Sequence, residues 1–387
     1  MNPWRGLLVL TMAALLAAGC AAQPVVDIKP GEQPPLDTEE AGFWMQMDRI
    51  EQSVRTSGRV VRDPELNAYL REIFCDLSPD YCGDIRLYIV RAPGFNAAMM
   101  ANGTMQLWTG MLLRVQNEAQ LAAVLGHELT HYLRRHTLQK WRDIRAKTDA
   151  LAFFQFATAV VGLGIVGIVA QVATLGSIQS FNRDQERESD RVGFEMMAGA
   201  GYEPEAAPRI WDALVAEKEA SDRPKGSIFF ASHPTSEERR ETLAEMAAAY
   251  QATAAELGRK RFVEMTAGFR GGWLRDELRQ RDFGAMQVVL DNLKQAGANL
   301  GELYYYQGEL HRLRAETEEG DSDKAVTAYE KAIDLGGAPP EVHRALGLIH
   351  WSARRQSEAK LAFEAYLSAA AEAPDRAMIE HYLGQME

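Results

Sequence analysis

A His-Glu-x-x-His pentapeptide is the feature of this sequence that most constrains its fold and chemistry. It reads HELTH, with His127, Glu128 and His131, inside the apolar stretch QLAAVLGHELTHYL. Residues four apart lie on one face of an α-helix, so both imidazoles can bind one Zn²⁺ while Glu128 lies beside a metal-bound water. With only 8 His among 387 residues, such a motif is expected by chance roughly 0.02 times. The motif therefore predicts two zinc ligands and a general base on one helix.

A third protein ligand has to come from another part of the chain. Metzincins supply it with a glycine three residues after the second histidine and a third histidine three residues further on. Here Arg134 and Thr137 occupy those two positions, and His136 is one position away from the second. The metzincin class is therefore excluded.

The downstream segment RDQERESD offers two carboxylates with helical spacing. Glu186 and Asp190 are four residues apart and share one helix face. Glu186 is a candidate for the third metal ligand, and Asp190 is a candidate acceptor for a hydrogen bond from the far nitrogen of a zinc-bound histidine. The alternative is that these acidic residues, like Glu188 on another face of the helix, belong to a solvated charged surface.

The N-terminus has the layout of a secretory signal. Residues 1–20 combine a positive charge at Arg5, an apolar run and small residues before Cys20, a pattern too short and wrongly flanked for a membrane span. The ending AAGC resembles a bacterial lipoprotein box, which implies that Cys20 is lipidated, and Ala21 after it implies sorting to the outer membrane. An ordinary cleaved signal with a chance cysteine is the alternative. Residues 21–38 contain four prolines and no apolar periodicity, which predicts a Pro-rich tether.

If the chain is exported through this signal, the other two cysteines can form a disulfide. Cys75 and Cys82 flank the turn-rich segment DLSPDY, so a disulfide between them is expected in an oxidising periplasm. Two free buried cysteines are the alternative. Three cysteines in all are too few for a disulfide scaffold and too scattered for a Cys-rich metal site.

Residues 39–250 are expected to form a mainly helical α+β domain of the zincin metallopeptidase kind. Helical periodicity begins at Glu39 and again at Pro64, and the HELTH helix begins near Asn117. Between them, the alternating segment DIRLYIVRA and the segment TMQLWT (residues 104–109) each predict a strand. The pattern indicates helices that accompany a small β-sheet.

Residues 151–178 carry no charge and are long enough to span a bilayer once. They lie, however, between His131 and Glu186, which have to meet at one metal ion, and they are too short for two crossings. The sequence therefore predicts that this stretch does not span a membrane. A buried pair of helices is one interpretation, and contact with the membrane surface or with apolar substrate is the other.

Residues 255–387 are helical and contain a repeat. Two glycines recur at a spacing of 39 residues, and a set of small and aromatic residues recurs at a spacing of 34. The recurring residues are Gly308 and Gly347, and Ala325, Tyr329 and Ala332 with Ala359, Phe363 and Tyr366. This pattern resembles two to three tetratricopeptide units, whose concave surface would dock a partner. Helices that only cap the preceding domain are the alternative.

Several ordered motifs make residues 43–250 similar to one peptidase family. HELTH is followed after about 55 residues by E-x-x-x-D within NRDQERESD, and DPELNAYL, FNAAMMANGTMQLWTGML and SHPTSEER accompany them. The chain resembles the gluzincin metallopeptidases of the HtpX and CAAX prenyl protease type, especially their BepA-like periplasmic lipoproteins. The resemblance implies an endopeptidase that binds one Zn²⁺ through His127, His131 and Glu186 and uses Glu128 as general base.

The resemblance also implies roles for residues further along the chain. His233, in the His-Pro motif of SHPTSEER, matches a family histidine that can occupy the fourth zinc position and keep the enzyme latent. Arg239 matches a family arginine near the active site. A loop histidine before a helix-starting proline is the alternative for His233. Substrate is expected to lie extended along the 104–109 strand at a sheet edge, with Asn96 and Ala97 beside it.

The predicted function is that of a zinc metalloendopeptidase anchored to the outer membrane in the periplasm of a Gram-negative bacterium. The net charge of −12 gives no electrostatic footprint for nucleic-acid binding. The resemblance suggests unfolded or stalled envelope proteins as substrates, in protein quality control, with docking through the repeats to outer-membrane assembly machinery. A chaperone or adaptor lipoprotein with a structural or latent zinc site is the alternative. The intact Glu128 argues against it, because a structural site needs no base.

Overall fold

The structure is a computed structural model that describes residues 26–147, 181–222, 229, 233, 237–250 and 255–386. The predicted signal with Cys20, and the apolar stretch 151–178, lie outside the described residues. Within the described ranges, no helix combines the length and the hydropathy needed to cross a bilayer.

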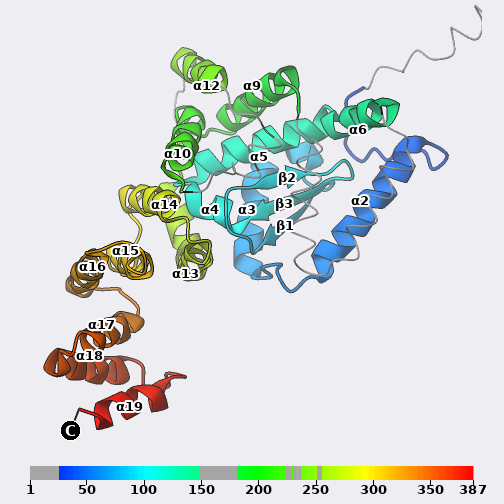
Figure 1. Cartoon of the computed structure of the whole chain (residues 1–387). Coiled ribbons are helices and arrows are strands. Elements are labelled where there is room, and N and C mark those ends of the chain that lie inside the picture. Colours follow the sequence, from blue (N-terminus) through cyan, green and yellow to red (C-terminus); the bar gives the residue numbers. More distant parts are fainter. Residues whose placement is uncertain are drawn as a thin grey trace, which may run out of the picture.

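The described residues form many helices and a small sheet, which confirms the predicted mainly helical α+β class (Figure 1). The first part of the chain contains α2 (Glu39–Thr56), α3 (Pro64–Leu77), η2 (Pro79–Tyr81), β1 (Arg86–Val90), β2 (Ala97–Met99), β3 (Thr104–Trp108), α4 (Thr109–Arg114), α5 (Glu118–Leu133), α6 (His136–Lys147), α9 (Arg183–Gly199), α10 (Ala206–Ala220) and α12 (Glu237–Ala249). The second part contains α13 (Arg259–Leu278), α14 (Phe283–Gln295), α15 (Leu300–Arg314), α16 (Asp321–Leu335), α17 (Glu341–Ser352), α18 (Gln356–Ala369) and α19 (Arg376–Gly384).

The sheet has the strand order β1-β3-β2. β3 pairs in parallel with β1, with Tyr88 opposite Gln106, and antiparallel with β2, with Ala98 opposite Gln106. β3 is therefore the central strand, and the expectation that a substrate pairs with it at a sheet edge is wrong. The reason is a tight turn after β2, closed by a hydrogen bond from the Met100 N–H to the Thr104 carbonyl. This turn folds β2 back onto β3, so β2 and β1 are the two outer strands of the sheet.

α5, which carries the HELTH motif, is buried on nearly all sides. Its N-cap is Asn117, whose side chain accepts a hydrogen bond from the Gln120 backbone N–H. The helix lies beside β2 on one side and packs against α9 and α10 on the other (Figure 1). A helix enclosed in this way is expected to be apolar around its whole circumference. The buried His127, Glu128 and His131 are exceptions, and each needs a partner inside the protein.

The described part of the Pro-rich segment is held against the domain. Ile28 is only 2% exposed, and its backbone N–H donates to the carbonyl of Leu133 at the end of α5. The Tyr81 hydroxyl donates to the Ile28 carbonyl. Cys75 and Cys82 form a disulfide that closes the loop carrying Tyr81. A short stretch that docks through one apolar side chain and backbone hydrogen bonds has no periodicity that sequence reasoning could detect.

The C-terminal helices pack as successive pairs, α15 with α16 and α17 with α18. A Cβ atom on Gly308 would lie 2.4 Å from the ring of Tyr329, and one on Gly347 would lie 2.5 Å from the ring of Phe363. Both pairs therefore use the same contact, in which a glycine of the first helix makes room for an aromatic ring of the second. This contact is the physical basis of the repeat seen in the sequence.

Arg114, at the end of α4, joins the two parts of the chain. Its side chain is 6% exposed and forms ion pairs with Glu217 of α10 at 2.6 Å and with Glu277 of α13 at 2.7 Å. A buried guanidinium is tolerated only when it is paired in this way.

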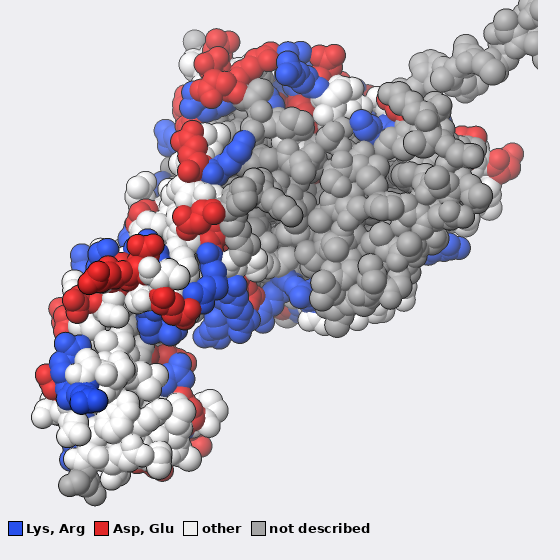
Figure 2. Space-filling model, in the orientation of Figure 1, with Lys and Arg blue, Asp and Glu red and all other residues white. Residues whose placement is uncertain are grey.

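On the surface, acidic and basic side chains are interspersed over α9, α12 and the C-terminal helices on the face shown in Figure 2.

Candidate metal centre

Two helices supply most of the polar side chains of the candidate site. α5 provides His127, Glu128 and His131, each 5% exposed or less. α9 provides Glu186 and Asp190, which are also buried. α9 begins with a capping box at Asn182, and this local start places Glu186 in the first helical turn.

Two glycines allow these helices to approach closely. A Cβ on Gly193 of α9 would lie 2.6 Å from the backbone nitrogen of His127, and a Cβ on Gly126 of α5 would lie 2.8 Å from the Gly193 carbonyl oxygen. Any larger side chain would have to push the helix backbones apart. The glycine pair therefore sets the separation at which the α9 carboxylates face the α5 histidines. Sequence reasoning missed this pair, although a glycine inside a helix is costly and so is a signal in itself.

The ligand atoms of His127, His131, Glu186 and His233 all lie within 4.8 Å of one another. His127 Nε2 lies 3.2 Å from His131 Nε2 and 3.3 Å from His233 Nδ1. Glu186 Oε1 lies 3.0 Å from His233 Nδ1 and 3.6 Å from His131 Nε2. The structure thus gathers four residues that the sequence and the resemblance singled out, from three separate segments.

The donor set fits Zn²⁺. Asp190 Oδ1 lies 2.9 Å from His127 Nδ1, so the proton of a neutral His127 belongs on Nδ1 and leaves a lone pair on Nε2. That lone pair faces His131 Nε2 across 3.2 Å in a buried site. Imidazole nitrogens and a carboxylate that converge in this way are the ligands that Zn²⁺ prefers. A cation between the two Nε2 atoms would remove the repulsion between their lone pairs. His127, His131 and Glu186 could therefore hold the metal, with His233 as a fourth ligand.

Arg239 of α12 organises the acidic side of the cluster. Its guanidinium donates to Asp190 Oδ2 at 2.6 Å and to Asp190 Oδ1 at 2.7 Å, and it forms a close ion pair with Glu186. The guanidinium carbon lies 4.3 Å from the ring centroid of Trp211, a cation–π contact that fixes its plane. Burial raises the pKa of Asp190, but hydrogen bonds and charge from Arg239 and a hydrogen bond to His127 lower it to about 2. Asp190 is therefore a permanent anion behind His127.

The environment of Glu128 suits a group that exchanges protons. Burial raises the pKa of Glu128, and the neighbouring His233 and His127 oppose this only in part. Glu128 Oε1 lies 3.4 Å from His233 Nε2 and receives no hydrogen bond from the part of the chain that the structure describes. Burial lowers the pKa of His233, but the carboxylates of Glu186 and Glu128 outweigh it, so the pKa of His233 is raised. His233 thus lies between the candidate base and the candidate ligand.

His136 and Glu188 are also part of the site, which sequence reasoning missed. His136 Nδ1 lies 3.0 Å from His131 Nδ1, and His136 Nε2 lies 3.2 Å from Glu188 Oε2. The position of His136 excludes the metzincin pattern, and Glu188 reads as part of a solvated face. Neither the position of His136 in the sequence nor the charge of Glu188 shows that the turn after α5 brings His136 next to His131.

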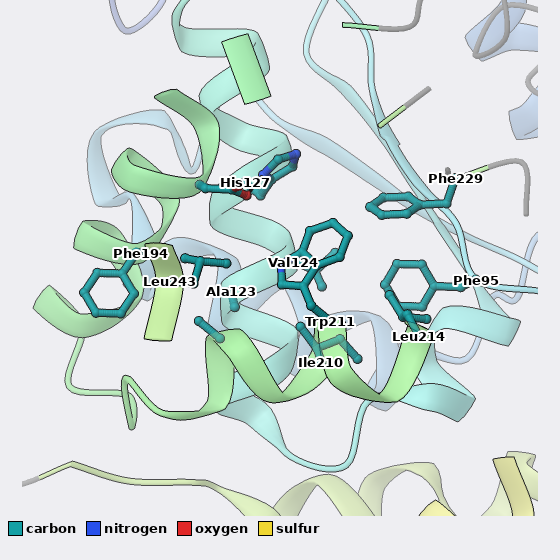
Figure 3. A pocket seen from close by; sticks show the side chains of 12 residues that line it. Phe95, Ala123, Val124, His127, Phe194, Ile210, Trp211, Leu214, Phe229 and Leu243 are labelled. Carbon is teal, nitrogen blue, oxygen red and sulfur yellow. Dashed lines mark hydrogen bonds and ion pairs between the residues drawn. The ribbon is translucent and has the colours of Figure 1, made fainter. Parts of the chain in front are cut away.

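An apolar pocket opens beside His127 (Figure 3). Figure 3 shows His127 at one end, with aromatic and aliphatic side chains of several segments around the space. The pocket is lined by Phe95, Ala123, Val124, His127, Asp190, Phe194, Ala207, Ile210, Trp211, Leu214, Phe229 and Leu243. A pocket of this composition suits an apolar side chain.

Comparisons with known proteins agree with this geometry. Residues 60–247 match the family described as Peptidase family M48. A Vibrio cholerae protein classed by name with the beta-barrel assembly-enhancing proteases is 28% identical over 255 residues, which cover 61% of this chain and 51% of the relative. The Escherichia coli beta-barrel assembly-enhancing protease is 25% identical over 248 residues, 60% of this chain and 50% of the relative.

A further similarity covers a shorter segment. The mitochondrial metalloendopeptidase OMA1 of Schizosaccharomyces pombe is 30% identical over 154 residues, which cover 40% of this chain and 44% of the relative. The chain spans about half the length of the curated relatives that it matches first. The residues that match the family, 60–247, contain the gathered side chains of α5 and α9.

Proposed function

The chain belongs to peptidase family M48 through residues 60–247, and from this premise we propose that it is a zinc-dependent endopeptidase of unfolded or stalled envelope proteins. The observation that carries the proposal is the buried cluster of His127, His131, Glu186 and His233, with Glu128 at its side. A buried carboxylate whose pKa is raised beside a cluster of metal ligands suits a general base.

In this proposal, each side chain of the cluster has a separate task. His127, His131 and Glu186 hold Zn²⁺, which when bound lowers the pKa of a water and polarises the scissile carbonyl. Glu128 takes a proton from the attacking water at Oε1 and later delivers it to the leaving amine. Asp190 and Arg239 fix the orientation of His127 and Glu186.

The substrate is proposed to bind at the edge of the sheet as an extended strand. β2 is the edge strand that lies beside α5, so its outer edge can pair with a peptide in a β-strand conformation. Phe95, two residues before β2, lines the apolar pocket beside His127. A substrate on β2 could therefore place an apolar side chain in that pocket.

His233 is proposed to keep this site latent. Its imidazole lies 3.0 Å from Glu186 Oε1 and 3.4 Å from Glu128 Oε1, so it would compete with the attacking water and the carbonyl for the same space. Catalysis would require its displacement. If all four side chains bound the zinc ion, they would give it the coordination of a structural site. The gathering of these four side chains therefore favours a second candidate function, a chaperone or adaptor lipoprotein with a permanently closed zinc site.

The cellular setting belongs to the proposal as well. A secretory signal with lipidated Cys20, and the disulfide between Cys75 and Cys82, suit a lipoprotein of the periplasm anchored to the outer membrane. The C-terminal helix pairs are proposed to act as tetratricopeptide-like units that dock the enzyme to outer-membrane assembly machinery. The names of the bacterial relatives, which describe proteases that enhance β-barrel assembly, support the link to assembly.

The proposed function can be tested by comparing an unfolded with a folded substrate. We expect the zinc-loaded chain to cleave an unfolded outer-membrane β-barrel protein, and to leave the same protein intact after it has folded in detergent, because an edge strand can capture only an unpaired segment. The His233→Ala variant is expected to cleave faster than the wild type, with equal zinc content. Fragments are followed by gel and mass spectrometry. Zinc in both proteins without any cleavage would favour the adaptor function.

A further inference from the structure

The two candidate histidine ligands of α5 are supported in different ways. His127 Nδ1 faces the carboxylate of Asp190 directly. His131 Nδ1 faces a second imidazole, that of His136, at 3.0 Å. The other nitrogen of His136 lies 3.2 Å from Glu188 Oε2. Each of the two histidines is therefore connected to a carboxylate. Asp190 contacts His127 directly, whereas Glu188 is connected to His131 through the ring of His136.

The protons in this chain of contacts can be placed. His131 Nε2 is the atom that joins the ligand cluster, so in a metal-binding neutral ring its proton is on Nδ1. That N–H then donates to His136 Nδ1, which has to be an acceptor, and the proton of His136 is therefore on Nε2. This second N–H donates to Glu188 Oε2. One tautomer of each ring satisfies every contact, so the contacts select the form of His131 that binds metal.

The backbone is shaped to bring His136 into this position. α5 ends at Leu133, and Arg135 adopts the left-handed conformation with φ 53°, which a residue other than glycine rarely adopts. The Arg135 guanidinium is held by an ion pair with Glu40 of α2 at 2.8 Å. The tight turn places His136, only 1% exposed, against His131. A strained residue that the surroundings hold in place is typical of a functional position.

Further contacts restrict the orientation of the His131 ring and the position of the Glu188 carboxylate. The ring of Phe181 stacks on His131, with centroids 3.7 Å apart and planes at 19°, which fixes the ring plane but still allows a flip of the ring by 180° about its Cβ–Cγ bond. The hydrogen bond to His136 Nδ1 selects one of these two orientations. Glu188 Oε1 forms an ion pair with Arg134 Nε at 3.1 Å, so the end of the chain of contacts is anchored too.

We propose that His136 and Glu188 are positioning residues that orient His131 and set its tautomer for metal binding. The proposal rests on the metal site of the proposed function. Hydrogen-bond partners of this kind commonly change metal affinity by about 10- to 100-fold when they are removed. Neither residue touches the metal or the substrate in this account.

The test measures zinc affinity, independently of cleavage. Zinc-free wild type, His136→Phe, Glu188→Gln and Glu195→Gln are titrated with Zn²⁺ in competition with a chelating dye. His136→Phe keeps an aromatic ring but removes the acceptor, and Glu188→Gln removes the charge. Glu195→Gln is the matched control, because Glu195 is an exposed carboxylate of the same helix that pairs with Arg191. Thermal unfolding of the zinc-free proteins shows whether each variant is folded.

We expect His136→Phe to weaken zinc binding about 10- to 100-fold and Glu188→Gln to weaken it several-fold, with Glu195→Gln equal to wild type. The visible spectrum of the Co²⁺-loaded protein should change for the first two variants only. Equal zinc affinity in all four proteins would overturn this proposal and leave the proposed function intact. A wild type that binds no zinc would overturn both. If His136→Phe does not fold, the partly exposed Glu188 still decides the outcome.

Discussion

Replacing Glu128 by Gln is expected to lower the rate of peptide-bond cleavage by about 100- to 10,000-fold, the usual range for a lost general base. The amide keeps the shape of the side chain but cannot accept and return a proton. Glu128 is 1% exposed and lies next to His233 and the ligand cluster, so no water-borne base can easily replace it. Initial rates on an unfolded outer-membrane protein measure the loss.

The control for Glu128→Gln is a carboxylate on the same helix. Glu118, in the first turn of α5, is buried and accepts a hydrogen bond from the Tyr69 hydroxyl, away from the ligand cluster. Glu118→Gln retains an acceptor for this bond and is expected to cleave like the wild type. Both variants should contain one zinc per chain. Cleavage by Glu128→Gln at the wild-type rate would show that Glu128 is not the base.

Replacing Gly193 by Ala is expected to lower both the stability of the protein and its affinity for zinc. The added Cβ would lie 2.6 Å from the backbone nitrogen of His127, so α5 and α9 have to separate. Overpacking of this kind costs about 1–3 kcal/mol of unfolding free energy. Because Glu186 and Asp190 lie on α9, the separation also moves them away from His127. We expect zinc affinity to fall by about 10- to 100-fold, the range for the loss of a contact that supports a metal ligand.

Gly199 provides the matched control for this substitution. It is the last residue of α9, and a Cβ at this position would meet no atom within 4 Å. Gly199→Ala should therefore keep zinc affinity and raise helix stability slightly, since alanine is the better helix former. Zinc affinity and the denaturant midpoint are measured for both variants. Equal values for Gly193→Ala and Gly199→Ala would refute the role of the close helix contact.

The parts of the site that were predictable from the sequence depend on local geometry. The spacing of His127, Glu128 and His131 alone places them on one helix face, because helix periodicity is a local property. Glu186 and Asp190 share a face for the same reason. Their meeting with α5 depends on a contact between distant segments, which spacing left open and the family resemblance suggested.

The features that sequence reasoning missed arise from tertiary packing. The sheet order depends on where the turn after β2 returns the chain, and no strand pattern specifies it. His136 reaches His131 only through the left-handed turn at Arg135. The Gly126–Gly193 contact depends on how two helices cross. Only the two glycines are visible in the sequence as unusual residues within helices, and their meaning requires the partner segment.

The decisive experiment titrates Zn²⁺ into the zinc-free His233→Ala variant and follows the cleavage of an unfolded outer-membrane protein at each step. We expect the cleavage rate to rise in proportion to added zinc and to stop rising at one equivalent per chain. The same titration of a chain that also carries Glu128→Gln should give zinc binding without cleavage. A site that fills with one zinc while His233→Ala hydrolyses no peptide bond would contradict the claim that this cluster is the centre of a peptidase.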